Sequence, residues 1–113
     1  MNDTIYALST PAGNGIAIIR LSGSESLSIL KKVFSKKTQY ESHKLYYGHV
    51  IDNNGIVDES LAVYFAAPKS YTGEDMAEIQ CHGSTAVITQ ILNMLLEFGL
   101  RYAEPGEFSK RAF

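Results

Sequence analysis

Residues 70–83, SYTGEDMAEIQCHG, begin with turn-forming residues and continue as an alternation of apolar and polar side chains. This pattern predicts a β-strand. Because successive strand side chains point to opposite faces, Glu78, Gln80 and His82 share one face. The side chains on the other face, which suit a hydrophobic core, are Ala77, Ile79 and Cys81. The polar face fits either a small-molecule site or the solvated side of an edge strand.

A second strand is predicted for residues 15–23, GIAIIRLSG. Arg20 shares a face with Ile16 and Ile18, so it extends an otherwise apolar row. A lone arginine near a strand end is most often a surface group with a buried stem. It gains functional meaning if a carboxylate or an anionic ligand lies nearby, because a charge-assisted contact contributes roughly 1.5–3 kcal/mol.

Helical periodicity appears twice. Ser22 and Glu25 have the spacing of a capping box, and apolar side chains then recur at helical intervals. Those side chains are Leu27, Leu30 and Phe34. In residues 84–98, Ser84 is the predicted N-cap and Gly99 ends the helix. The apolar stripe of this second helix comprises Val87, Ile91, Leu95 and Phe98, widened by Ile88, Leu92 and Met94.

Short β-prone runs complete the pattern. They are residues 4–9, 45–51, 61–65 and 100–103, and residues 52–55 form a hairpin-type connection. The order ββαβββα(β) predicts the α+β class, with a mixed β-sheet and two packed helices. Another helix is expected to begin after Pro105 and Gly106. Because the sequence ends at Phe113 inside the first turns of that helix, we expect the chain to be part of a longer protein.

Composition narrows the class of function. The 113 residues, 45% of them hydrophobic, suffice for one domain with one core. A formal net charge of −2 argues against binding a nucleic-acid backbone unaided. A single cysteine excludes an internal disulfide framework and fits a reducing compartment. No signal peptide and no membrane-spanning segment is evident, so we predict a cytoplasmic protein.

The residue types for catalysis or metal binding lack the required arrangement. The sequence has no G-x-x-x-x-G-K-[ST] phosphate-binding loop and no G-x-S-x-G elbow. Cys81 and His82 are adjacent on a strand and face opposite ways, so they are not expected to form a dyad. His43 and His49 lack partner ligands at metal-site spacing. We therefore predict ligand binding, with no catalytic residue and no metal site.

Three blocks of the sequence resemble the N-terminal domain of the MnmE (TrmE) family of tRNA uridine-modification GTPases. They are residues 3–23 (DTIYALSTPAGNGIAIIRLSG), 70–83 and 103–113 (AEPGEFSKRAF). Two positions depart from the family pattern. The loop between Pro11 and Ile16 is one residue shorter than the usual glycine-rich form, which bears on how it closes over a ligand. Ser84 stands where a second glycine is common.

The resemblance implies a fold similar to half of the aminomethyltransferase folate-binding fold. Residues 1–104 are then a tetrahydrofolate-binding and dimerisation domain, and residues 105–113 begin the connection to a helical and GTPase region. The implied ligand is 5-formyltetrahydrofolate or methylenetetrahydrofolate. The implied folate-binding residues are Arg20 and Glu78, with a further lysine beyond the present chain. Weaker candidates for the pocket wall are Tyr71, Gln80 and His82.

For the full-length protein, the resemblance implies a homodimer with GTP, magnesium and potassium in the missing region. It also implies a flavin-containing partner, MnmG, and a carboxymethylaminomethyl-type modification of the tRNA wobble uridine, with folate supplying a carbon. An alternative is a dimerisation module with no effective ligand site. A free-standing aminomethyltransferase is a weaker alternative, because such enzymes duplicate the domain within one chain and no internal repeat is present here.

Overall fold

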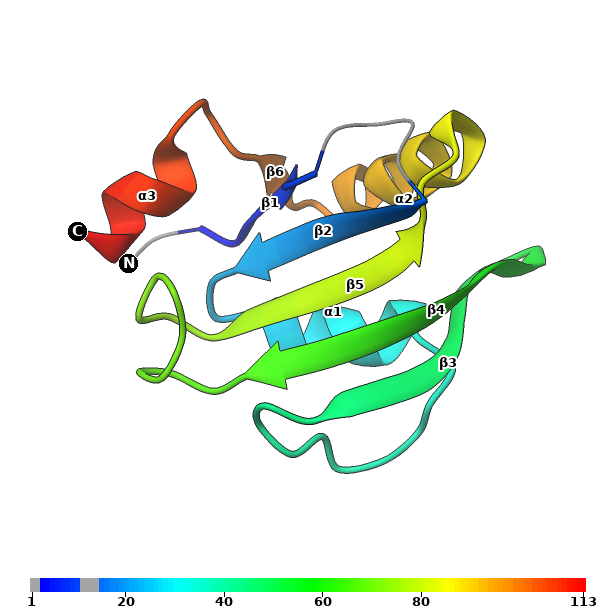
Figure 1. Ribbon diagram of the computed structural model, residues 1–113, viewed down its shortest axis with the longest axis horizontal. Helices are drawn as coiled ribbons and strands as arrows, with labels where there is room; N and C mark the ends of the chain where they lie inside the picture. Colours follow the sequence, from blue (N-terminus) through cyan, green and yellow to red (C-terminus); the bar gives the residue numbers. More distant parts are fainter. Residues whose placement is uncertain (1–2, 11–14) are drawn as a thin grey trace.

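The computed structural model describes residues 3–10 and 15–113, which form a six-stranded sheet and three helices (Figure 1). The elements follow the predicted order, including the short strand and the short helix near the end. Their bounds are β1 Ile5–Leu8, β2 Ile16–Ser22, α1 Ser26–Val33, β3 Leu45–Asp52, β4 Gly55–Phe65, β5 Met76–His82, α2 Thr85–Glu97, β6 Arg101–Tyr102 and α3 Glu107–Ala112.

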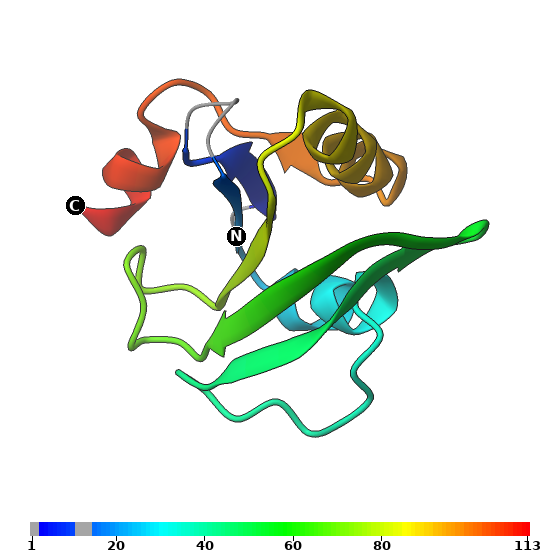
Figure 2. The same ribbon diagram turned by 45° about the vertical axis from the view of Figure 1, so that its right-hand side comes forward.

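The sheet has the strand order β3-β4-β5-β2-β1-β6. Neighbouring strands are antiparallel except β1 and β6, which run parallel. Helices α1 and α2 share one hydrophobic core with the sheet. Helix α3 lies beside the N-terminal end of β1 (Figures 1 and 2). The predicted α+β class with a mixed sheet is confirmed.

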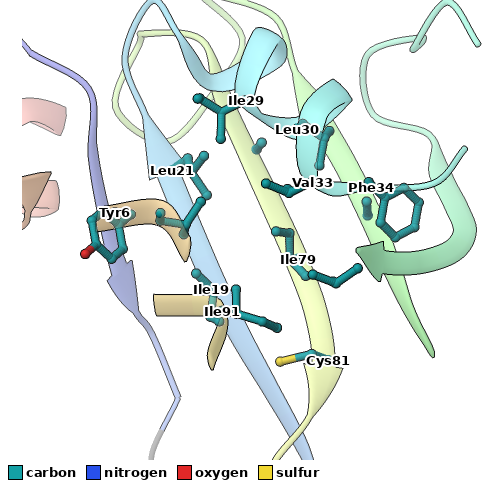
Figure 3. Close-up of a cluster of buried hydrophobic side chains, with 14 of the residues drawn as sticks. Tyr6, Ile19, Leu21, Ile29, Leu30, Val33, Phe34, Ile79, Cys81 and Ile91 are labelled. Carbon is teal, nitrogen blue, oxygen red and sulfur yellow. The ribbon is translucent and has the colours of Figure 1, made fainter. Parts of the chain in front are cut away.

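The core lies between the two central strands and helices α1 and α2. The buried side chains of β2 are Ala17, Ile19 and Leu21, and those of β5 are Ala77, Ile79 and Cys81. The β5 set is the one that the alternation predicts for the core, and the β2 set is the face opposite Arg20. Figure 3 shows Leu30 of α1 and Ile91 of α2 packed with them. Burying one such aliphatic side chain contributes about 1.5–3 kcal/mol, so this layer fixes which face of each strand points away from the helices.

Helix α2 begins as its sequence predicts. The hydroxyl of Ser84 accepts a hydrogen bond from the Val87 amide at 3.2 Å, which satisfies one free donor of the first turn. The buried side chains are Ile88, Ile91, Met94 and Leu95. The prediction that Phe98 belongs to the buried stripe is wrong, because Phe98 follows the last helical residue and is 44% exposed. The Lys32 ammonium lies 5.6 Å from the centroid of its ring.

The predicted capping box at Ser22 is wrong. Ser22 is the last residue of β2 and pairs with Met76 of β5, so the sheet rather than the helix determines its backbone. Its fully buried hydroxyl donates to Glu74 at 2.8 Å and also contacts Thr72. Helix α1 begins four residues later. Its N-cap residue, Glu25, makes no side-chain cap, and the Thr4 hydroxyl accepts from the Glu25 amide at 3.1 Å.

The β3–β4 hairpin turns where the sequence predicts, at residues 53–54. The Asp52 carboxylate accepts a hydrogen bond from the Asn54 amide at 2.8 Å, as asparagine and aspartate do in tight turns. Strand β4 is longer than residues 61–65, because residues 55–63 pair with β3 on one side while residues 61–65 pair with β5 on the other. Long β4 therefore joins the edge of the sheet to its centre.

Gly48 of β3 provides a test of the packing between α1 and the sheet. A Cβ atom at this position would lie 2.9 Å from two ring atoms of Phe34 and 2.9 Å from the Ser35 hydroxyl. Phe34 is fully buried, so its ring has little room to move. We expect Gly48→Ala to lower the free energy of unfolding by about 1–3 kcal/mol, as overpacking does.

Gly15→Ala is the matched control for this substitution, because a Cβ atom there meets no atom within 4 Å. We expect it to change stability by less than about 0.5 kcal/mol. Urea unfolding of both variants, followed by circular dichroism, measures the difference. Equal stability of the two variants would contradict the packing described here.

Candidate functional site

A cavity of about 460 Å³ opens on the face of the sheet that α1 and α2 leave uncovered. We call it the sheet cavity. It is lined by Arg20, His43, Phe65, Lys69, Ser70, Tyr71, Met76 and Glu78. These residues come from β2, from the ends of β4 and β5, from the loop between those two strands, and from the segment before β3. Its volume lies in the range of small-molecule sites.

Two of the sequence-predicted site residues, Arg20 and Glu78, form an ion pair in this cavity. They are direct partners in the β2–β5 register, and Arg20 Nε donates to Glu78 Oε2 at 2.8 Å. The side chain of Glu78 is 13% exposed and that of Arg20 is 37% exposed. Among the residues that the structure describes, no hydrogen-bond partner reaches the second carboxylate oxygen of Glu78. The pair thus presents an oriented carboxylate acceptor to the cavity.

The loop between β4 and β5 forms a wall of the sheet cavity. Asp75 holds both ends of this loop, because its carboxylate accepts from the Ala67 amide at 2.8 Å and from the Tyr64 hydroxyl at 3.2 Å. The Ser70 hydroxyl donates to the backbone carbonyl of Glu74, which closes the loop on itself. Lys69 lies on this braced backbone with its side chain exposed.

Tyr71, a weaker candidate from the sequence, joins this wall to helix α3. Its side chain is half exposed, and its hydroxyl lies 3.1 Å from the Ser109 hydroxyl of α3. The rings of Tyr71 and Phe113 are also in edge-to-face contact, with centroids 6.4 Å apart. Figure 2 shows α3 beside the loop that carries Tyr71. Tyr71 therefore lines the cavity and also contacts α3.

An ion-pair network fastens α3 to the sheet. Arg111, whose side chain is only 8% exposed, donates to Asp3 Oδ1 at 3.0 Å, Glu74 Oε1 at 3.0 Å and Glu107 Oε2 at 3.3 Å. Arg101 of β6 also bonds to both Asp3 and Glu107. Hydrogen bonds from Arg101 are the main cause that lowers the pKa of Asp3 and of Glu107 to about 2. The charges of this network stabilise the docked position of α3.

Gln80 and His82 lie away from the sheet cavity. They line a second cavity of about 210 Å³, together with Ile16, Tyr47, Glu59, Ser60, Leu61 and Cys81. The reason is the strand rise of about 3.3 Å per residue, which separates positions 78 and 82 by roughly 13 Å. The His82 ring contacts Asp58 at 2.9 Å, and the His82 amide donates to the same carboxylate at 3.0 Å. The structure brings Arg20, Glu78 and Tyr71 together, but not these two residues.

Neighbours also determine the ionisation of Asp58 and Cys81. Burial opposes ionisation of Asp58, but hydrogen bonds from the His82 amide, Ser60 and the His82 ring together lower the pKa of its carboxyl. Burial raises the pKa of the Cys81 thiol to about 11, so the thiolate that a nucleophile requires is scarce at neutral pH. Cys81 is buried on the core face, whereas the His82 ring contacts Asp58.

Two kinds of feature are absent from residues 3–10 and 15–113. No group of three or more His, Cys, Asp or Glu side chains in this part of the chain is placed to hold a metal ion. None of its helices combines the length and the apolar character that crossing a membrane requires. The shortened loop after Pro11 falls largely outside the described residues, so its effect on a ligand stays a prediction.

Sequence reasoning missed several lining residues of the sheet cavity. Lys69 directly precedes the block 70–83, so its position beside that block was a usable signal. His43 carried no such signal, because it reaches the cavity through a tertiary contact: its amide donates to the Tyr64 carbonyl at 2.8 Å. Its ring meets the ring of Phe65 edge to face, with centroids 4.9 Å apart. Residues distant in sequence thus complete the wall.

Comparison with known proteins identifies one family. The family model described as "GTP-binding protein TrmE N-terminus" matches residues 4–113. The chain is 50% identical over 115 residues to the tRNA modification GTPase MnmE of Pseudothermotoga lettingae, covering 100% of this chain and 26% of that protein. It is 51% identical over 114 residues to the tRNA modification GTPase MnmE of Lactococcus lactis, covering 98% and 25%. The chain spans about a quarter of the length of these relatives.

The ion-pair network predicts a measurable acid transition. The ordinary pKa values of Asp3 and Glu107 are 3.8 and 4.5, and both are lowered to about 2 in the folded chain. Their contribution to α3 docking is therefore fully present above about pH 4.5 and is lost as the pH falls towards 2. We expect the carboxyl ¹³C chemical shifts of both residues to titrate with midpoints near pH 2. In Arg101→Met both midpoints should rise, and ordinary midpoints in the unaltered chain would contradict the network.

Proposed function

The chain belongs to the family of TrmE N-termini, as its sequence blocks predicted, and we propose that it binds a one-carbon tetrahydrofolate and dimerises within a tRNA modification GTPase. The ligand in this proposal is 5-formyltetrahydrofolate or methylenetetrahydrofolate. The observation that carries it is the Arg20–Glu78 pair, which turns an oriented carboxylate towards a cavity of about 460 Å³.

The chemistry of a pterin fits this carboxylate. The 2-amino-4-oxo edge of a pterin presents two parallel N–H donors, and a carboxylate accepts such a pair of donors with its two oxygens. Glu78 supplies that acceptor and orients the ligand. Arg20 balances its charge and holds its rotamer through the 2.8 Å contact. Phe65 and Tyr71 supply apolar surface for the rest of the ligand.

The proposal also covers the full-length protein, and this part of it rests on the family. The bound folate supplies a carbon for carboxymethylaminomethyl modification of the tRNA wobble uridine, in the cytoplasm. GTP, magnesium and potassium act in the region outside these 113 residues, and MnmG is the flavin-containing partner. Residues 1–104 form the folate-binding and dimerisation domain, and residues 105–113 begin the connection to the helical and GTPase region.

A dimerisation module without an effective ligand site is the second candidate function. Exposed apolar side chains favour it: Ile16 is 61% exposed and Tyr47 is 59% exposed, and both line the second cavity. Large apolar side chains that lie together on the surface often mark a site where another protein binds. Both candidates include dimerisation, so the decisive question is whether a reduced folate binds.

The first test is Glu78→Gln, which keeps the shape of the side chain and removes its charge. Loss of a charge-assisted acceptor worth about 1.5–3 kcal/mol should weaken the binding of 5-formyltetrahydrofolate about ten- to one-hundredfold. Isothermal titration calorimetry measures this affinity. The matched control is Glu59→Gln, on the same face but outside the sheet cavity, which should leave the affinity unchanged. Unchanged affinity in Glu78→Gln would refute the assigned role of Glu78.

The second test separates the two candidate functions. Sedimentation velocity of the unaltered chain should show a species of twice 12.5 kDa, with and without 5-formyltetrahydrofolate. A dimer that binds the folate supports the proposed function. A dimer that shows no binding in calorimetry favours the dimerisation module, and a monomer under all conditions contradicts the dimerisation part of both.

A further inference from the structure

The charges that line the sheet cavity do not balance. The chain as a whole has a formal net charge of −2, whereas the cavity carries two permanent cations, Arg20 and Lys69, and one acid, Glu78. Arg20 and Glu78 neutralise each other through their 2.8 Å contact. The positive charge of Lys69 is thus in excess at this cavity, and a negatively charged group of a ligand would complement it.

Lys69 is available for such a group. Its side chain is exposed, and among the described residues no carboxylate and no hydrogen-bond acceptor contacts its ammonium. Its backbone is held in place, because the Lys69 amide donates to the Ala66 carbonyl at 3.0 Å and the loop is braced by Asp75. A fixed backbone with a long unpaired cation can reach an anion at the mouth of the cavity without rearranging the loop.

The lining groups of the sheet cavity differ in their exposure to solvent. Glu78 is 13% exposed and lies on the sheet, whereas Lys69 is exposed and lies on the loop above it. Phe65 and Tyr71 line the same cavity. A carboxylate at the floor, aromatic walls and an ammonium at the mouth match the order of parts in a folate: a pterin, an aminobenzoyl ring and a glutamyl tail that carries carboxylates.

We propose that Lys69 binds the carboxylates of the folate's γ-glutamyl tail, so that the site prefers reduced folates with several glutamates over those with one. This inference rests on the proposed folate function and adds a specificity-determining residue to it. Each added glutamate places another carboxylate near the mouth of the cavity. The ammonium of Lys69 is solvated, so its contact with the tail is modest in strength and is screened by salt.

The experiment compares three probes by calorimetry on the 113-residue chain. They are 5-formyltetrahydrofolate with one glutamate, the same compound with three glutamates, and a tetrahydropterin that lacks the tail. We expect the triglutamate to bind about two- to fivefold more tightly than the monoglutamate at low salt, with the difference shrinking as salt is added. Lys69→Ala should abolish this preference, and Lys69→Glu should reverse it.

Lys36→Ala is the matched control, because it removes the same charge from an exposed lysine outside the sheet cavity. It should keep the preference, and the tail-free tetrahydropterin should bind all variants equally. A preference that survives in Lys69→Ala, or no preference in the unaltered chain that still binds the monoglutamate, overturns this inference alone. Failure of every probe to bind the unaltered chain overturns the proposed function and this inference together.

Discussion

The pairing of β2 with β5 determines both the central part of the core and the ion pair of the sheet cavity. Ile19 pairs with Ile79, and on the next rung Arg20 pairs with Glu78. Because strand side chains alternate, the register that buries the two isoleucines must also place the two charges together on the opposite face. A slip of one residue would turn charges towards the core, where an unpaired ion costs several kcal/mol. The hydrophobic core therefore fixes the geometry of the ion pair.

That ion pair contributes little to the stability of the chain. Arg20 is 37% exposed, and pairs with such access to water contribute about 0–1 kcal/mol. Under the proposed function the pair preorganises the site: Arg20 holds the Glu78 carboxylate in one position before the ligand arrives, which reduces the ordering cost of binding.

Local patterns predicted the parts of this structure that local forces determine. The faces of β2 and β5, the cap at Ser84 and the hairpin at residues 53–54 all follow from alternation, capping and turn chemistry. The predicted cap at Ser22 was wrong because the pairing of Ser22 with β5 outweighed its capping-box spacing. His43 was not found because contact with the end of β4 brings it to the cavity. Contacts between segments distant in sequence are the information that periodicity lacks.

The cavity wall also depends on α3. Tyr71 contacts Ser109 and Phe113, while Arg111 of the same helix bonds Glu74 at the end of the loop. The loop and α3 therefore hold each other in position. A ligand that immobilises Tyr71 favours the docked position of α3, and by thermodynamic reciprocity a docked α3 favours the ligand by the same factor. The ion pairs of Arg111 thus help to hold this wall of the sheet cavity as well as α3.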